Sequence, residues 1–356
     1  MVARRELFRY VLSTWMASAL PVTVWAYPGN GEIPKPLVPS DGVSTEGVGG
    51  SVDAPKIVVI GVGGGGNNTI DYMIDHHVRG VDFISVNTDA QSLNAGRAKK
   101  IIQLGASGLG TGGNTALAGL AATQTEHALR SALDGAHMLF ITAGLGGGTG
   151  TGAAPMIARV AKGMGILTVG VVTQPFEFEG RHRVNTANAG IAELKNHVDA
   201  LIIVPNDMLL TSLGEDVSMA EGFAYSNGLT KDVISGFSGI VNAPGHVNVD
   251  LEDVRTLLRG PGKAALGVAV ASGLDRAGVA AQQALNYPLM QGVDLSNAKG
   301  VLVVISAAKG ILKLSESKLV MKTIRASTSP DASLIYGTNR DESLNDGVRV
   351  TVVAMG

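Results

Sequence analysis

Three glycine-rich segments could bind an anion through their backbone. They are GVGGGGNN (61–68), GLGTGGN (108–114) and GGGTGTG (146–152), and each follows an apolar run. The third opens a predicted helix that tolerates Pro155 in its first turn. Bare amides at a helix amino end offer aligned donors and the positive end of the helix dipole, and Thr149 and Thr151 can add hydroxyl groups. No lysine follows the glycines, so this is not a Walker A loop.

The elements around these segments alternate between strand and helix patterns. Strands are predicted over 56–62, 81–89, 137–144, 167–174 and 200–207, and helices over 68–78, 120–133 and 153–165. This alternation predicts a parallel, doubly wound α/β sheet, whose ligands lie at the carboxyl ends of the strands. The three glycine segments would therefore converge on one edge.

Two ligand classes fit such an edge. A nucleoside triphosphate could use all three segments, whereas a nicotinamide cofactor needs only one. The spacing G-x-G-x-x-G at Gly61, Gly63 and Gly66, with Asp82 or Asp89 as a ribose-binding acid, keeps the dinucleotide alternative open. A tight strand-to-helix turn without a ligand would have the same spacing.

A second region follows a long helical pattern. Six residues are spaced alternately four and three apart, which marks one face of a helix over about 219–242. They are Phe223, Asn227, Thr230, Ile234, Phe237 and Val241. Strands over 300–307, 332–338 and 349–355, with a helix near 315–327, predict a smaller α+β domain. We expect an extension and linker over 1–54, a nucleotide-binding domain over 55–218, a central helix over 219–245 and a C-terminal domain over 246–356.

Composition excludes several classes of function. Charge is nearly balanced, with 28 Lys and Arg against 30 Asp and Glu, so we expect no nucleic-acid partner. The absence of cysteine excludes a disulfide framework and a thiolate nucleophile or metal site. No histidine spacing suits a metal site, so no protein-held metal cluster is expected.

The first residues differ from the rest. Arg4, Arg5 and Arg9 precede an apolar run from Val11 to Ala26, and a Pro-, Gly- and Ser-rich linker follows. This pattern is typical of a secretory signal, a short membrane anchor or an organellar transit peptide, and an incidental extension would also fit. A membrane contact through this segment is one hypothesis.

Several motifs together resemble the FtsZ family, the bacterial relatives of tubulin. Besides the glycine segments, they are FISVNTDAQSL, PFEFEGRHR, IIVPNDMLL and VNVDLEDVRTLL, in the family's order from about residue 55 to 356. The resemblance implies a cytoplasmic GTPase that binds GTP or GDP with Mg²⁺ and polymerises with itself, head to tail, at the division site. The family's C-terminal docking peptide does not follow residue 356 in this sequence.

The resemblance also assigns residues to the nucleotide. It implies contacts to the phosphates and ribose, and contacts to the base from two asparagines and a stacking aromatic. The residues are Gly63, Gly64, Asn68, Gly110, Gly112, Gly113, Gly147, Gly148, Thr149, Gly150, Glu179, Arg183, Asn206, Phe223 and Asn227. On spacing alone, Glu179 and Arg183 would be a surface ion pair, and Phe223 would be core.

The resemblance further implies that Asn248, Asp250 and Asp253 enter the nucleotide pocket of a neighbouring subunit and act on the attacking water. The residues alone support one step of this. Phe223 and Asn227 share a helix face near its amino end, roughly 20 to 25 Å from the acidic run beyond its other end. If both act on one GTP, they belong to different molecules. Without the resemblance, the acidic run would be a solvated turn.

Some positions depart from the family pattern. They are Asn114, Thr115 and Ala116 in the second glycine segment, His137, Gly228 and Pro261. These departures leave an alternative open: a divergent paralogue that binds GTP and co-polymerises or regulates, with weak hydrolysis. The retained Asp250 and Asp253 favour an active GTPase.

Overall fold

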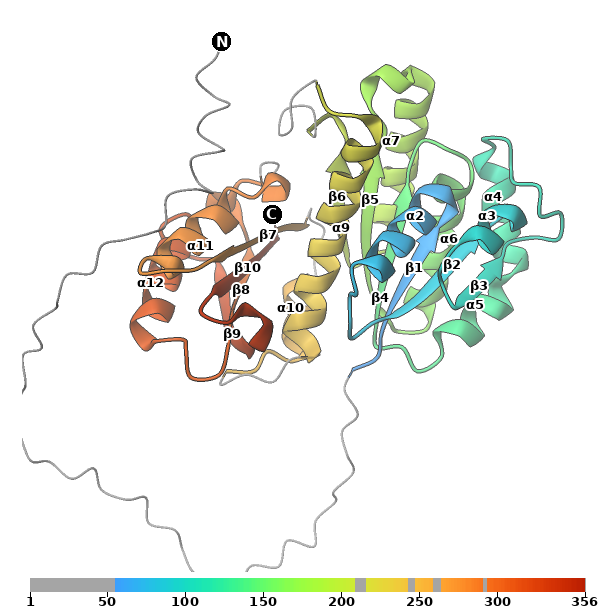
Figure 1. Cartoon of the computed structure of the whole chain (residues 1–356). Coiled ribbons are helices and arrows are strands. Elements are labelled where there is room, and N and C mark those ends of the chain that lie inside the picture. Colours follow the sequence, from blue (N-terminus) through green and yellow to red (C-terminus); the bar gives the residue numbers. More distant parts are fainter. Residues whose placement is uncertain (1–54, 209–215, 243–246, 259–263, 291–292, 356) are drawn as a thin grey trace, which may run out of the picture. The chain divides into compact units, whose positions relative to one another are not determined.

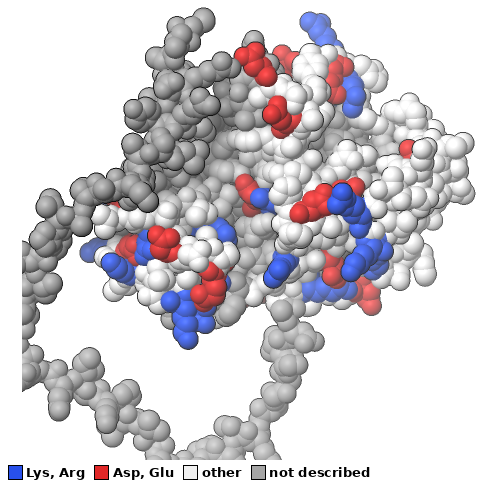
Figure 2. Space-filling model, viewed as in Figure 1, with Lys and Arg blue, Asp and Glu red and all other residues white. Residues whose placement is uncertain are grey.

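The computed structural model describes residues 55–208, 216–242, 247–258, 264–290 and 293–355 (Figure 1). The predictions about the extension 1–54 and about Pro261 lie outside these residues. Within the described part, no helix is both long and apolar enough to cross a membrane. On the face shown in Figure 2, basic and acidic side chains are interspersed.

The first domain contains the predicted parallel sheet. Its strands are β1 (Ile57–Val62), β2 (Asp82–Asn87), β3 (Lys100–Gln103), β4 (Met138–Gly144), β5 (Leu167–Gln174) and β6 (Ala200–Pro205). Their order is β3-β2-β1-β4-β5-β6, and every pairing is parallel. The doubly wound fold expected from the alternating pattern is confirmed. The order reverses between β1 and β4, where such sheets leave a crevice for a ligand.

Helices connect these strands. They are α2 (Gly63–Asp75), α3 (Ala90–Ala95), α4 (Thr115–Gln124), α5 (Glu126–Leu133), α6 (Thr149–Gly163) and α7 (Arg181–Lys195), with a 3-10 turn η1 (Glu177–Glu179). The single helix predicted over 120–133 is wrong, because two helices meet at Thr125. The hydroxyl of Thr125 accepts a hydrogen bond from the Gly105 amide and donates one to the Ala121 carbonyl, which anchors the break. Helices α2 and α6 begin inside the glycine segments, earlier than predicted.

The central helix α9 (Met219–Asn242) has the bounds that the periodicity predicts. Its buried face joins a core shared by both sheets, seen in Figure 1 as the helix between them. Phe237 is fully buried and its ring lies 5.6 Å from that of Phe140 on β4. The helix therefore fixes the second domain to the first through apolar packing.

The second domain contains a mixed sheet. Its strands are β7 (Ala264–Ala271), β8 (Gly300–Ala307), β9 (Ser333–Arg340) and β10 (Val348–Met355), in the order β7-β10-β8-β9. The helices are α10 (Leu251–Leu258), α11 (Arg276–Leu285) and α12 (Leu314–Arg325), with 3-10 turns η2 (Pro288–Met290), η3 (Leu295–Asn297) and η4 (Glu342–Leu344). Strand β10 is antiparallel to both neighbours, and β8 pairs with β9 in parallel.

A buried ion pair joins the two outer helices of this domain. The guanidinium of Arg276, on α11, donates to both carboxylate oxygens of Glu316, on α12, at 2.7 and 3.0 Å. The same guanidinium also donates to the carbonyls of Ile311 and Asp346. The hydrogen bonds from Arg276 to the Glu316 carboxylate lower the pKa of Glu316 from its ordinary value.

Candidate functional site

The three glycine segments pack against one another at the carboxyl edge of the first sheet. Gly63 has φ +71°, and a Cβ there would lie 2.9 Å from the Gly150 amide nitrogen. A Cβ on Gly148 would lie 2.2 Å from the Thr111 hydroxyl oxygen and 2.9 Å from the Gly113 carbonyl carbon. Side chains at these positions would push the loops apart, so the predicted convergence is confirmed and its glycines are needed for contact.

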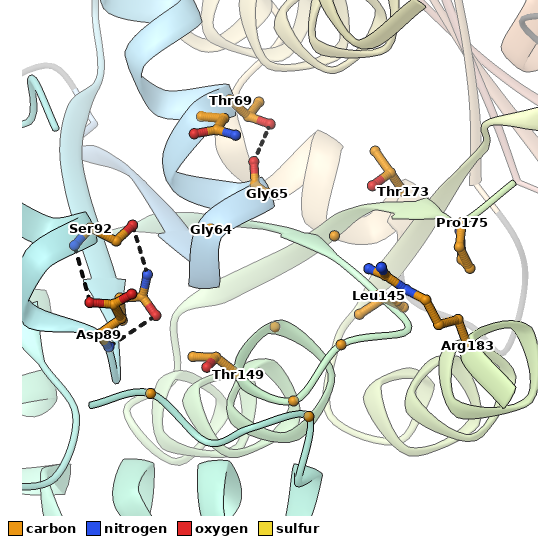
Figure 3. A pocket seen from close by; sticks show the side chains of 18 of the residues that line it. Gly64, Gly65, Thr69, Asp89, Ser92, Leu145, Thr149, Thr173, Pro175 and Arg183 are labelled. Carbon is orange, nitrogen blue, oxygen red and sulfur yellow. Dashed lines mark hydrogen bonds between the residues drawn. The ribbon is translucent and has the colours of Figure 1, made fainter. Parts of the chain in front are cut away.

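These loops line a cavity of about 560 Å³ (Figure 3). Of the nucleotide contacts assigned from sequence, it brings together Gly64, Asn68, Gly110, Gly112, Gly113, Gly147, Gly148, Thr149, Gly150, Glu179, Arg183, Asn206, Phe223 and Asn227. Gly63 is buried beneath the loops instead. Asp89, one of the two candidate ribose-binding acids, also lines the cavity, and sequence reasoning missed Gly65, Thr69, Asn87, Ser92, Thr111, Gly144, Leu145, Thr173, Pro175 and Ser226. Asn87, Gly144 and Thr173 end or nearly end strands, so the carboxyl-edge rule could have found them.

Two helices present uncapped amino ends to this cavity. Helix α2 begins at Gly63 and α6 at Thr149, and neither has a side-chain cap or an acidic residue in its first turn. By contrast, Asp89 caps α3 and Asn114 caps α4. Open amides and a positive dipole end without a nearby carboxylate are suited to an anion such as a phosphate chain.

The two candidate ribose-binding acids, Asp82 and Asp89, lie at different edges of the sheet. Asp89 lines the cavity, but one of its oxygens accepts the amides of Gln91 and Ser92 at 2.9 and 3.2 Å (Figure 3). Asp82 begins β2 at the amino edge of the sheet and does not line the cavity. The prediction that Asp82 contacts a ligand of this cavity is therefore wrong.

Another part of the cavity wall, formed by η1, α7 and α9, combines an ion pair and two aromatic rings. Arg183 and Glu179 lie 3.2 Å apart, and Glu179 also accepts the Phe176 amide at 2.9 Å. The spacing-based expectation of an ion pair is therefore confirmed, and the pair lines the cavity. Phe223 is 44% exposed and meets the ring of Phe176 edge-on at 6.1 Å, so the expectation that it is plain core is wrong.

Two asparagine amides close the end beside α9. The Asn206 side-chain oxygen accepts the hydroxyl of Ser226 at 3.2 Å. The Asn227 side-chain oxygen accepts the hydroxyl of Thr69 at 2.8 Å. Asn206 follows β6, and Thr69 lies on α2, so three distant segments of sequence supply this polar cluster.

The acidic run lies elsewhere. Asn248, Asp250 and Asp253 do not line the cavity. Asp250 and Asp253 each accept the other's backbone amide, at 2.8 and 3.1 Å, and form a capping box at the start of α10. The run is exposed at Asp250 and Glu252, as a solvated turn would be, but it starts a helix rather than forming a turn.

Helix α10 contacts the opposite edge of the first sheet. Arg255 donates to the carbonyl of Gly165, which precedes the amino end of β5. The cavity is lined by Thr173 and Pro175, at the carboxyl end of the same strand. An eight-residue strand spans roughly 26 Å. The cavity and the acidic run thus lie at opposite edges of the sheet.

Two of the positions that depart from the family pattern, Asn114 and His137, make local hydrogen bonds. The Asn114 side chain accepts the amide of Leu117 at 3.1 Å and caps α4. The Nδ1 atom of His137 accepts the Lys56 amide at 3.1 Å. A Cβ on Gly228 would meet only the Tyr72 hydroxyl, at 3.5 Å, so nothing nearby requires a glycine there.

The cavity offers oxygen ligands rather than a preformed metal cage. In the described residues, no group of three His, Cys, Asp or Glu side chains could hold a metal ion. Asn87, Asp89 and Thr149 line the cavity with oxygen atoms. This donor set suits Mg²⁺, which takes few protein ligands and completes its shell with phosphate oxygens and water.

Comparisons with known proteins agree across both domains. A sequence model described as "Tubulin/FtsZ family, GTPase domain" matches residues 56–214, and one described as "FtsZ family, C-terminal domain" matches residues 262–356. Cell division protein FtsZ of Neisseria meningitidis is 48% identical over 311 residues, covering 86% of this chain and 79% of the relative. The FtsZ of Buchnera aphidicola (subsp. Schizaphis graminum) is 46% identical over 303 residues, covering 84% and 79%. A solved FtsZ dimer of M. jannaschii superposes with a TM-score of 0.77 at 36% identity, covering 85% of this chain and 88% of that one.

Proposed function

The chain belongs to the FtsZ family of tubulin-like cell-division GTPases, and we propose that its subunits polymerise head to tail and hydrolyse GTP where one subunit meets the next. The observation that carries this proposal is the separation of the cavity from the acidic run. They occupy opposite edges of one parallel sheet. We place the polymer at the division site, as the family's role in cell division suggests.

The cavity supplies the binding half of the reaction. The open amino ends of α2 and α6 would hold the phosphates, with the Thr149 hydroxyl beside them. Mg²⁺, when bound, would neutralise charge on the phosphate oxygens. Glu179 and Arg183 would contact the ribose end, and Phe223 would stack on the base with Asn206 and Asn227 at its edge. A nicotinamide cofactor would leave two of the three glycine segments without a role.

The acidic run would supply the hydrolytic half. Asp250 and Asp253 would orient and polarise a water molecule that attacks the terminal phosphorus, with Asn248 helping to place it. The phosphorus–oxygen bond to GDP breaks, and the products are GDP and inorganic phosphate. Phosphoryl transfer of this kind depends mainly on placement and electrostatics, which fixed carboxylates can provide.

Polymerisation follows from the same separation. Within one subunit, the part of α9 from Asn227 to its end at Asn242 is about 23 Å long, so the carboxylates of a subunit cannot reach the cavity of the same subunit. A contact that joins one pole to the opposite pole of the next copy is heterologous and does not close on itself. Repeated, it builds a filament whose contacts complete each active site.

GTP turnover measured against protein concentration tests this proposal. Turnover per subunit should rise steeply with concentration in the native chain. It should be lost in Asp250→Asn, while GTP affinity is kept because Asp250 lies outside the cavity. Glu252→Gln is the matched control, since Glu252 is an exposed acid of the same turn that pairs with Arg255. Constant turnover per subunit down to the dilute monomer would refute the intermolecular site.

The same measurement separates the alternative, a paralogue with weak hydrolysis. That protein would bind GTP but show negligible turnover at every concentration. A membrane contact through residues 1–54 is a separate hypothesis that rests on Arg4, Arg5, Arg9 and the apolar run. Sedimentation with anionic liposomes should then require those residues, and equal sedimentation without them would reject it.

A further inference from the structure

Two hydroxyl groups outside the set assigned from sequence hold the asparagine amides of the cavity. Thr69, on α2, donates to the Asn227 side-chain oxygen, and Ser226, on α9, donates to the Asn206 side-chain oxygen. Both hydroxyl residues are 3% exposed. Water therefore has little access to replace either hydroxyl, and each amide depends on its neighbour for orientation.

This arrangement turns the nitrogen ends of both amides toward the ligand. With each oxygen engaged, the NH₂ group of each asparagine is the end left for the cavity. Asn206 is 5% exposed, and no described residue accepts a hydrogen bond from its NH₂ group. The nitrogen is not one of the described buried polar atoms without a partner, so it is open to the cavity. A ligand that displaces water from it must supply an acceptor, because an unpaired donor is costly. The end of the cavity beside Asn206 and Asn227 thus presents two hydrogen-bond donors, and a ligand with two acceptors would complement them.

Purines differ in what they offer to such donors. Guanine carries acceptors at O6 and N7, whereas adenine carries an acceptor at N7 and a donor amino group at position 6. Two amide NH₂ groups complement the two acceptors of guanine. With adenine, one of them would face the 6-amino group, so that two donors oppose each other. A site built around hydrogen-bonding groups discriminates strongly against a ligand that leaves them unpaired.

We propose that Thr69 and Ser226 are positioning residues that make this cavity select a 6-oxopurine nucleotide, by holding the Asn227 and Asn206 amides with their nitrogens toward the base. The inference rests on the proposed nucleotide function of the cavity and adds the residues that set its base preference. Neither hydroxyl needs to touch the ligand. Without it, an amide is free to turn over, and a turned amide presents an acceptor that suits the 6-amino group of adenine.

Thr69 also has a bond that a purely local role would explain. Its hydroxyl also has the Gly65 carbonyl, one turn earlier in α2, as an acceptor at 3.0 Å, as is common for threonine in helices (Figure 3). Because a hydroxyl carries one proton, the Gly65 and Asn227 oxygens share it. The contact to Asn227 is shorter, at 2.8 Å, and joins α2 to α9. The two roles predict different results when the hydroxyl is removed.

The test compares dissociation constants of GTP, ITP and ATP for the full chain, measured at a concentration below assembly. ITP keeps O6 and N7 but lacks the 2-amino group, so it should bind within about threefold of GTP, and ATP should bind at least about 100-fold more weakly. Thr69→Val and Ser226→Ala should each shrink the ratio of ATP to GTP dissociation constants by about tenfold. Thr69→Ser restores the hydroxyl and should keep the native ratio.

Thr230→Val is the matched control, because Thr230 is a buried residue one turn further along α9 whose hydroxyl donates to the Ser226 backbone carbonyl and, among the described residues, bonds neither asparagine amide. It should leave the ratio unchanged. Unchanged ratios in Thr69→Val and Ser226→Ala, or an equal weakening of all three nucleotides, would overturn the positioning role. ITP binding more than tenfold weaker than GTP would show that the amides face the base with their oxygens. A native chain that binds none of the three would instead refute the proposed nucleotide function.

Discussion

Two adjacent glycines should separate loop packing from ligand contact. A Cβ on Gly148 would lie 2.9 Å from the Gly113 carbonyl carbon and 3.0 Å from the Asn114 nitrogen, both backbone atoms that cannot rotate away. A Cβ on Gly147 would meet nothing within 4 Å, although Gly147 lines the cavity. Gly148→Ala should therefore lower the stability of the protein without nucleotide. Gly147→Ala should leave that stability unchanged and weaken nucleotide binding.

The magnitudes follow from these contacts. Gly148 has φ −78°, so alanine adds no backbone strain, and its cost is overpacking of about 2 kcal/mol. In a protein of this size that lowers the melting temperature by about 3 °C. Gly147→Ala should change the unfolding free energy by less than about 0.5 kcal/mol. It should weaken GDP binding by at least about tenfold, or about 1.4 kcal/mol, because its methyl group occupies space at the phosphate loop.

Calorimetry without nucleotide, followed by titration with GDP, measures both effects on the same samples. GDP is used because it is not hydrolysed during the titration. A native melting temperature in Gly148→Ala would mean that the glycine segments do not pack as described. Native GDP affinity in Gly147→Ala would mean that the third glycine segment does not face the ligand.

Three further predictions concern stability. Glu316→Gln should lower the unfolding free energy by about 3 kcal/mol near neutral pH, because it leaves the buried Arg276 without its carboxylate. The pKa of Glu316 is lowered in the folded protein, so its stabilisation is present above the unfolded pKa and is lost as pH falls through the folded one. Denaturation of both proteins from neutral to acid pH should show the difference in unfolding free energy shrink as pH falls, and a constant difference would contradict this. Phe237→Ala should cost about 3 to 5 kcal/mol by urea unfolding, since the ring is fully buried against Phe140, and a loss below about 1 kcal/mol would contradict the role of α9 in joining the domains. Gly228→Ala should raise stability by up to about 1 kcal/mol, because the position is helical and has room for a methyl group; a lower melting temperature would show a need for glycine that the described contacts do not.

The first domain was largely predictable because its signals are local. Apolar runs such as IVVIGV and MLFITA mark buried strands, and glycine segments after three of the strands mark loops at one edge. The second domain was less predictable. Strand β7 reads AALGVAVA, which has no polar residues and therefore no alternation of apolar and polar positions, and α11 is similarly alanine-rich. Such segments become strand or helix through the packing of neighbours, which a local pattern does not contain.

The polar cluster at the base end shows a different limit. Thr69 and Asn227 lie 158 residues apart, and Ser226 and Asn206 lie 20 apart. Phe223 and Asn227 could be paired by helical spacing, but no spacing relates a hydroxyl on α2 to an amide on α9. Their meeting depends on how α2 and α9 pack, so only the folded structure brings them together.

The capping box at the start of α10 bears on how assembly could switch on hydrolysis. One oxygen of each carboxylate, from Asp250 and Asp253, already accepts a backbone amide of its own subunit. These bonds order both side chains within the subunit. Among the described residues, no hydrogen bond to the second oxygen of either carboxylate is seen, so under the proposed mechanism that oxygen would face the water molecule. In the proposed head-to-tail contact, the neighbouring subunit would bring only the nucleotide, and the acidic run would need no folding when the contact forms. Asp253→Asn should therefore retain the cap through its amide oxygen and lose hydrolysis, whereas Asp253→Ala should lose both and lower the melting temperature. If the asparagine variant were destabilised as much as the alanine variant, the cap would not be what orders this turn.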